Sequence, residues 1–399
     1  KVPLIVSNAE VKHQYSSSHD QLEEKWVKQT TEKEKKYFKK KWRGFLGNAY
    51  LKEIKWGSKI YLENPSINIL SQSLGKTRLD KPLVSSIVPC YNRKEMLGLT
   101  IESLTKQDYL NQEIVFVDDG STEILGPFIK EKLKFFKGRW KIIRIDYNSG
   151  PGVARKIGMQ YCNGEYIQFI DSDDQPLPDK ISKQVYVMEK NKKLLMTYGT
   201  TIVGENDTDM RILGKTNQNK NRIAPLFPYQ VYWTTSSILW RKAYISDESW
   251  YPLYGSEDTL FEFLNGQLNY PIVHTSSDKP LLKKWLHPKN ISAEIASDFL
   301  YQMEILKCFD IIYRKLEYNR NDPQLKAIGE LYRKKIMFFL IQRRYKEANY
   351  CIKMFKKISD RKLSVENIAF SFTKIFSKRK VYRLLRMYYW VRKKTKNRL

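Results

Sequence analysis

The sequence is poor in cysteine and has no long apolar run. Its four cysteines lie far apart and include no Cys-x-x-Cys pair; they are Cys90, Cys162, Cys308 and Cys351. This spacing argues against a zinc ribbon or a dense disulfide framework and favours buried free thiols in a reducing compartment. The longest purely apolar run, Ile336–Ile341, is far shorter than the roughly 18 to 20 residues that span a bilayer. We therefore predict no transmembrane segment.

Acidic residues are scarce relative to basic ones. Lys and Arg number 71 against 43 Asp and Glu, a net charge of +28, and residues 320–399 hold 24 basic against 5 acidic residues. Such an excess indicates a surface attracted to phosphates, nucleic acid or anionic lipid. Residues 378–399 mix Arg and Lys with Tyr388, Tyr389 and Trp390, which is typical of a helix on an anionic membrane surface. A solvated helix packed against its own domain explains the same pattern.

Three regions follow from composition and pattern. The chain has 399 residues, 42% of them hydrophobic, which is enough for more than one globular domain. Residues 1–80 are expected to form an N-terminal extension with a charged helix, and Lys1 in first place suggests the end of a preceding domain in a longer protein. Residues 81–290 are expected to form an α/β domain, and residues 291–399 a helical, basic C-terminal region.

Short β-branched runs alternate with segments of helical length between residues 81 and 290. The expected strands are 83–89, 113–117, 141–145, 166–170 and 195–203; the expected helices are 95–107, 125–136, 153–162 and 179–191. This alternation predicts an α/β fold with a mostly parallel, Rossmann-like sheet and helices on both faces. Ligands of such sheets bind beyond the carboxyl ends of the strands, so the residues that follow each strand are the candidate site.

Two strand ends carry groups suited to a nucleotide. The first ends in Pro89 and is followed by Tyr91 and Asn92, and the second is followed by Asp118 and Asp119. A tyrosine ring offers a face on which a base stacks, and a carboxylate accepts a hydrogen bond from a base N–H group. Each motif alone is also explained by an ordinary turn, because Asp-Gly is a common turn pair.

The strand at 166–170 runs directly into Asp171, Ser172, Asp173 and Asp174. Carboxylates this close repel one another, and a divalent cation bound through oxygen, such as Mn²⁺ or Mg²⁺, removes that cost. Such an ion bridges the phosphates of a nucleotide and stabilises a leaving diphosphate. A solvated acidic loop is the alternative.

Two further segments complete the set of motifs. The glycines at 150 and 152 open a helix that contains Arg155, which favours a phosphate site, although turn chemistry explains the glycines equally well. No complete dinucleotide fingerprint or P-loop is present, which argues against a dehydrogenase or a P-loop enzyme. Asp258, after Glu257, is a candidate general base. Alternatively, Ser256 or Asp258 is simply a helix cap.

The order and separation of these motifs resemble the family 2 inverting glycosyltransferases of GT-A fold. The motifs are Ile87–Asn92, Val117–Ser121, Gly150–Gly158, Asp171–Asp174 and Glu257-Asp258, and the resemblance covers residues 83–290. It implies a metal-dependent enzyme, with Mn²⁺ or Mg²⁺, that transfers a sugar from a nucleoside-diphosphate sugar with inversion. Uracil is the expected base. The implied acceptor is a hydroxyl of a glycan or lipid-linked glycan in cell-surface polysaccharide biosynthesis.

The resemblance also implies roles for single residues. The first loop, with Pro89, Tyr91 and Asn92, is expected to bind the nucleotide, as are Asp118 and Asp119. The other implied site residues are Arg155, Asp171 and Ser172 at the nucleotide sugar, Asp171, Asp173 and His287 at the metal, Asp258 as catalytic base and Glu257 as its acidic neighbour.

Two departures from the family pattern are visible. Relatives commonly have Ala-Arg-Asn where this chain has Ala154-Arg155-Lys156, so the role of the third position is open. The Gln-x-x-Arg-Trp signature and membrane spans of processive polysaccharide synthases do not follow Asp258. The sequence therefore favours an enzyme that makes a single transfer.

Two other classes of function compete with this interpretation. A nucleic-acid-binding protein would use the basic surface, but no known nucleic-acid motif is present. A catalytically inert scaffold is disfavoured by the presence of Asp119, Asp173 and Asp258. We therefore predict no nucleic-acid partner. We also predict a cytoplasmic location. We further expect residues 378–399 to bind an anionic membrane surface peripherally, on its inner face.

Overall fold

The computed structural model describes residues 66–75, 80–223, 232–253, 255–267, 270–275, 279–286, 299–316 and 322–359. The chain divides into two compact units, Lys1–Cys308 and Phe309–Leu399, and each is treated separately. Most of the N-terminal extension, the segment that contains His287 and the basic segment 378–399 lie outside the described residues.

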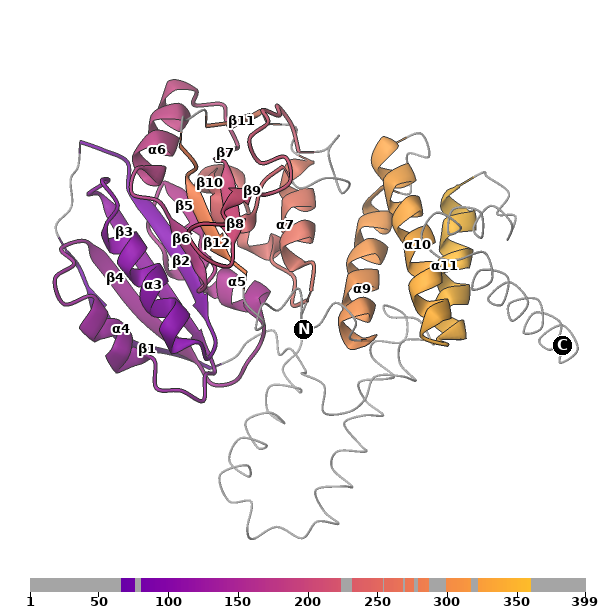
Figure 1. The fold of residues 1–399 in the computed structure, drawn as a ribbon, viewed down its shortest axis with the longest axis horizontal. Coiled ribbons are helices and arrows are strands. Elements are labelled where there is room, and N and C mark those ends of the chain that lie inside the picture. Colours follow the sequence, from indigo (N-terminus) through magenta and orange to yellow (C-terminus); the bar gives the residue numbers. More distant parts are fainter. Residues whose placement is uncertain are drawn as a thin grey trace, which may run out of the picture. The chain divides into compact units, whose positions relative to one another are not determined.

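The first unit is built on an eight-stranded sheet (Figure 1). Its strands, in spatial order, are β1 (Ile67–Ser73), β4 (Arg139–Ile145), β3 (Gln112–Asp119), β2 (Val84–Cys90), β5 (Tyr166–Phe169), β10 (Ile238–Arg241), β7 (Met196–Tyr198) and β11 (Ile272–His274). The central four strands, β4 to β5, are parallel, whereas β1 and β10 pair antiparallel with their neighbours. The predicted mostly parallel α/β sheet is confirmed, and β1 extends it N-terminal of residue 81.

Helices cover both faces of this sheet because β3 is apolar on both sides. Ile114 and Phe116 point to the core under α3 (Lys94–Thr105) and α4 (Gly126–Lys132). Val115 and Val117 point to the opposite core, which includes α5 (Pro151–Tyr161) and Phe261 of α7 (Glu257–Gly266). Neighbouring residues of a strand face opposite sides, so an uninterrupted apolar strand requires two helical layers. A further helix, α6 (Lys180–Lys190), packs near β7 and β10.

The first unit also contains a second sheet of four strands. Its order is β6 (Asp174–Pro176), β12 (Leu282–Trp285), β8 (Thr201–Gly204) and β9 (Arg211–Ile212). The expectation of one strand over 195–203 was wrong, since this run forms β7 in the main sheet and β8 in the second. The chain changes sheet at Gly199, where a Cβ atom would lie 2.6 Å from Leu281 Cδ1. Short 3₁₀ helices are η3 (Thr235–Ser237), η4 (Lys242–Tyr244) and η5 (Asp247–Ser249).

Three long helices follow: α9 (Phe299–Leu316), α10 (Pro323–Ile341) and α11 (Tyr345–Ile358). Within the second unit, the Asp310 carboxylate accepts hydrogen bonds from the hydroxyl groups of Tyr332 and Tyr350. In the described part of the chain, no helix is long and apolar enough to cross a bilayer. All four cysteines are free and buried, as their spacing predicted.

Packing of α5 on β2 gives a stability prediction. A Cβ atom on Gly158 would lie 2.3 Å from Ile87 Cγ2, far inside van der Waals contact. We expect Gly158→Ala to lower the free energy of unfolding by about 1–3 kcal/mol, because overpacking outweighs the gain of about 1 kcal/mol in helix propensity. Combining it with Ile87→Leu, which lacks the Cγ2 methyl, should restore part of the loss. Denaturant titration measures the free energy of unfolding of both variants. A denaturation midpoint of Gly158→Ala equal to that of the wild type would contradict the packing.

Candidate active site

The strand order predicts a ligand crevice at the carboxyl ends of β2 and β5. From β2 the chain moves outward to β3 and β4, and it returns on the other side of β2 as β5. Connections on the two sides of β2 therefore diverge, and a ligand crevice is expected at that edge. The loop 90–93 after β2 and the acidic loop 171–174 after β5 lie at this edge.

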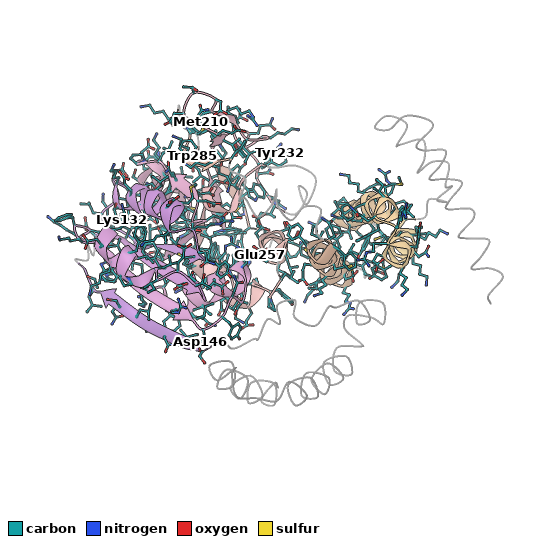
Figure 2. All side chains as sticks on the ribbon, turned by 60° about the horizontal axis from the view of Figure 1, so that its bottom comes forward. Lys132, Asp146, Met210, Tyr232, Glu257 and Trp285 are labelled. Atoms are coloured by element: carbon teal, nitrogen blue, oxygen red, sulfur yellow. The ribbon has the colours of Figure 1, made fainter. Side chains whose placement is uncertain are left out.

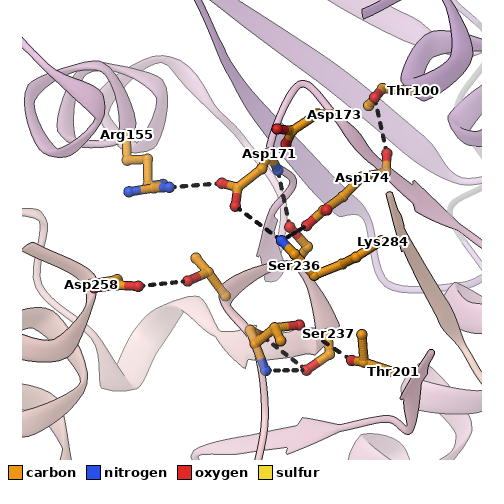
Figure 3. A network of polar contacts seen from close by, with 12 residues as sticks. Thr100, Arg155, Asp171, Asp173, Asp174, Thr201, Ser236, Ser237, Asp258 and Lys284 are labelled. Carbon is orange, nitrogen blue, oxygen red and sulfur yellow. Dashed lines mark hydrogen bonds and ion pairs between the residues drawn. The ribbon is translucent and has the colours of Figure 1, made fainter. Parts of the chain in front are cut away.

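Each carboxylate of the acidic loop is paired with a basic side chain. Figure 3 shows the pairs of Asp171 and Asp174. Asp171 Oδ1 lies 2.7 Å from Arg155 Nη2, and Asp173 Oδ2 lies 2.9 Å from Arg93 Nη1. Lys284 Nζ lies 2.7 Å from Asp174 Oδ2 and 3.7 Å from Asp171 Oδ2. The sequence motif is thus a compact cluster of ion pairs and not a freely solvated acidic loop.

The two ends of this loop differ in protonation behaviour. Burial raises the pKa of Asp174 to about 7, despite the opposing effect of Lys284. For Asp171 burial acts in the same direction, but Arg155 and Lys284 outweigh it and hold the pKa below its ordinary value. Of these two carboxylates, Asp171 therefore stays ionised more firmly, because opposite charges within about 4 Å favour the charged form.

Arg155 joins the acidic loop to the start of α7. Its side chain is 5% exposed, it donates to Glu257 Oε1 at 2.8 Å as well as to Asp171, and its guanidinium carbon lies 5.0 Å from the centre of the Trp250 ring. Burial raises the pKa of Glu257 to about 7, assisted by Asp258 and opposed by Arg155. Figure 2 labels Glu257 together with Lys132, Asp146 and Met210 on the first unit.

The 3₁₀ helix η3 connects Asp258 with the same loop. Thr235 Oγ1 donates to Asp258 Oδ2 at 3.1 Å, while the hydroxyl of neighbouring Ser236 accepts from the backbone N–H of Asp171 at 3.0 Å. Asp258 Oδ1 accepts from the backbone N–H of Thr259, and Ser256 makes no side-chain cap bond. Asp258 remains partly exposed at the start of α7. The Asp258 carboxylate is thus held by η3 through Oδ2 and by the first turn of α7 through Oδ1.

Several residues predicted to bind the nucleotide form contacts between neighbouring loops and strands. Asn92 Oδ1 accepts from the backbone N–H groups of Thr122 and Glu123, so it ties the loop after β2 to the loop after β3. Asp118 is buried and pairs with Arg144 at 2.5 Å.

The carboxylate of Asp119 is also engaged by the protein, since it accepts from the backbone N–H groups of Ser149 at 2.6 Å and Gly150 at 2.8 Å. Tyr91 is 40% exposed, Pro89 pairs with Val117 near the end of the β2–β3 ladder, and Ser172 is buried. Their nucleotide contacts stay predictions.

Four residues that contact the acidic loop or lie near Asp258 were not identified from the sequence. Arg93 directly follows the quoted loop motif, and Glu262 follows Asp258 by one helical turn, so both had a local signal. Glu262 Oε2 accepts from Trp233 Nε1 at 2.9 Å, and burial raises its pKa to about 8. Lys284 and Thr235 had no such signal, because their partners are distant in sequence.

The donor set fits a divalent cation that shares its ligands with a substrate. Side chains of Asp171 and Asp173 are 29% and 14% exposed and offer the hard oxygen ligands that Mg²⁺ and Mn²⁺ prefer. Five carboxylates, including Asp174, Glu257 and Asp258, face three cations, so negative charge is in excess when all are ionised. Among the described residues, no group of three or more His, Cys, Asp or Glu side chains surrounds one point. Further ligands must then come from outside this set.

Comparison with known proteins agrees with this geometry. Residues 85–246 match the family description "Glycosyl transferase family 2". An uncharacterized glycosyltransferase of Haemophilus influenzae is 40% identical over 121 residues, which cover 30% of this chain and 48% of that protein. The UDP-Glc:alpha-D-GlcNAc-diphosphoundecaprenol beta-1,3-glucosyltransferase WfgD of Escherichia coli is 33% identical over 137 residues, 34% of this chain and 51% of that protein. The chain therefore spans about half the length of these curated relatives.

Solved structures show a weaker likeness. Staphylococcus aureus TarS 1–349 in complex with UDP-GlcNAc has a TM-score of 0.46 and 18% identity, over 69% of this chain and 90% of that one. The family match, the motif order and the mostly parallel α/β sheet agree: residues 85–246 are similar to glycosyl transferase family 2, as the sequence resemblance predicted.

The Arg155 network gives a second stability prediction. Arg155→Met leaves Glu257 and Asp171 without their shared cation, so we expect a loss of about 3–5 kcal/mol in the free energy of unfolding. In a Glu257→Gln background the same substitution should cost about 1–3 kcal/mol less, because one of the stranded charges is gone. The adjacent Lys156→Met is the control: its partner Glu248 is 76% exposed, so a change below about 1 kcal/mol is expected. If Arg155→Met lowers the free energy of unfolding equally in the wild-type chain and in the Glu257→Gln background, the coupling is contradicted.

Proposed function

We propose that this chain is a metal-dependent, inverting glycosyltransferase that moves a sugar from a nucleoside-diphosphate sugar to an acceptor hydroxyl of a glycan or lipid-linked glycan. The observation that carries the proposal is the continuous network from Asp171 through Arg155 to Glu257, next to Asp258. This network holds an acidic donor-side loop and a partly exposed carboxylate at one crevice. A transferase needs both in the same place, because donor and acceptor must react within one encounter.

The donor is proposed to be a UDP-sugar that lies along the loops after β2 and β3. Tyr91 provides an exposed ring for stacking, and Pro89 and Asn92 shape the loop around it. Asp118 and Asp119 hold the neighbouring backbone in position for the base. Two relatives from Escherichia coli are named as UDP-Glc-dependent glucosyltransferases acting on diphosphoundecaprenol-linked GlcNAc, which supports a UDP-sugar, a lipid-linked acceptor and a role in cell-surface polysaccharide biosynthesis.

Asp171 and Asp173, with Ser172 between them, are the proposed protein side of an Mn²⁺ or Mg²⁺ site. Their partial exposure and the excess negative charge around them support this assignment. The ion, when bound, supplies positive charge to the leaving diphosphate. His287, which lies outside the described residues, stays a candidate ligand from the sequence.

Asp258 is the proposed general base. Its Oδ2 atom is held by Thr235, and the acceptor hydroxyl is proposed to lie beside this partly exposed carboxylate. Asp258 takes the hydroxyl proton while the acceptor oxygen attacks the sugar carbon opposite the leaving diphosphate, which inverts the configuration in one displacement. Glu257 and Arg155 fix the start of α7, so they position the base without contacting the acceptor.

The test of this function separates binding from chemistry. We expect Asp258→Asn to lower kcat by about 10²–10⁴, the typical share of general-base catalysis, with little change in donor affinity. Calorimetry with UDP-sugars and a transfer assay on lipid-linked or glycan acceptors measure the two quantities. Glu248→Gln, an exposed carboxylate of the same unit, serves as the control and should keep full turnover.

Two results would contradict the proposal. Unchanged turnover in Asp258→Asn would remove the base assignment, and an absence of binding by any nucleotide sugar, with or without Mn²⁺, would remove the donor site.

We propose that the enzyme is cytoplasmic and that residues 378–399 bind it peripherally to a membrane surface. The support is compositional, since Arg and Lys alternate there with Tyr388, Tyr389 and Trp390. We expect the chain to sediment with vesicles containing anionic lipid at low salt and to lose at least tenfold in affinity when 378–399 is deleted. Neutral vesicles are the control. Binding that persists after the deletion would place the membrane contact elsewhere.

A further inference from the structure

We infer that Lys284 is a resident counterion of the acidic loop which competes with the divalent cation and makes metal binding depend on the nucleotide. The inference rests on the proposed function and concerns the same site. It assigns a role to a residue that none of the motifs contains. Lys284 is a positioning residue here, because it acts on the carboxylates that would bind the ion.

Backbone pairing fixes the location of Lys284. In the antiparallel pair of β6 and β12, Lys284 is directly opposite Asp174, so their side chains lie on one face of the second sheet. Asp174 is 1% exposed, and Lys284 bonds to it at 2.7 Å while also reaching to 3.7 Å from Asp171. The ammonium group thus lies between a buried carboxylate and the more exposed one that is proposed to serve the metal (Figure 3).

Lys284 differs from Arg155 in its freedom to move. Arg155 is 5% exposed and donates to two carboxylates, so its position is determined from several sides. The Lys284 side chain is 27% exposed and consists of a flexible stem with a single charged group. It can therefore rotate toward a bound phosphate while it stays within the same crevice.

Electrostatics then links metal and nucleotide. With no nucleotide present, the positive charge of Lys284 is next to Asp171 and repels a second cation at that carboxylate. The diphosphate of a bound donor offers Lys284 a new partner, which reduces its hold on Asp171. Metal alone should accordingly bind weakly, and metal with nucleoside diphosphate should bind much more tightly.

The experiment compares Mn²⁺ affinity with and without a nucleoside diphosphate on the full chain. Free Mn²⁺ is read from its EPR signal, and UDP, GDP and dTDP are screened first so that the tightest is used. Lys284→Met alone would strand buried Asp174, so the test variant is Lys284→Met with Asp174→Asn, which removes both charges of the pair. Asp174→Asn alone retains the lysine. Lys283→Met, whose partner is the exposed Asp207, controls for loss of a lysine from the same strand.

We expect the double variant to bind Mn²⁺ alone at least tenfold more tightly than either Asp174→Asn or Lys283→Met. The ratio of Mn²⁺ affinities with and without the diphosphate should shrink by the same factor. Equal Mn²⁺ affinity in the double variant and in Asp174→Asn, with normal diphosphate binding, would overturn the role of Lys284 alone. If no nucleoside diphosphate binds the wild-type chain in any condition, the proposed donor site is wrong and the coupling fails with it.

Discussion

The buried guanidinium of Arg155 is the interaction on which the rest of the site depends. It gives one cation to two carboxylates, Asp171 after β5 and Glu257 at the start of α7, in a place from which water is largely excluded. Two unpaired carboxylates there would each carry a desolvation cost of several kcal/mol. The shared ion pair therefore sets the distance between the acidic loop and α7, and with it the position of Asp258.

The sheet explains why these groups meet at all. The strand order reverses at β2, so the loops after β2 and β5 diverge at the edge where a ligand crevice is expected. The helix η3 links this edge to α7, because it bonds to both Asp171 and Asp258. The second sheet then brings Lys284 to the same place through its pairing with β6. Local contacts within the crevice are polar, whereas the apolar cores lie on the two faces of the sheet and keep the strand ends rigid.

Much of this arrangement was predictable because its signals are local. The parallel strands and their helices follow from apolar runs alternating with helical segments, and the acidic loop is found directly after β5, where parallel sheets bind ligands. The split of 195–203 into two strands was missed because an apolar run carries no sign of a change of sheet. Lys284 was missed for a related reason: its pairing with Asp174 is set by strand register over 110 residues, which no local pattern encodes.

Predicted roles and observed contacts differ most in the nucleotide loops. Asn92, Asp118 and Asp119 were identified as binding residues from their positions after strands, and in the structure each one also holds a neighbouring loop by hydrogen bonds or an ion pair. A single side chain can satisfy the backbone of one loop and still leave the loop surface available to a base. The sequence pattern cannot distinguish these uses, because both need a polar residue at a strand end.

The separation of Asp174 and Lys284 also has a consequence for biosynthesis. The acidic loop leaves the ribosome 110 residues before the strand that carries its counterion, so a nascent chain ending near β10 has its parallel strands but lacks β12. In that interval Asp174 has no lysine opposite it and stays solvated. Closure of the second sheet is thus a late, long-range step of folding, and the crevice acquires its final charge only when the last strand of the unit is in register.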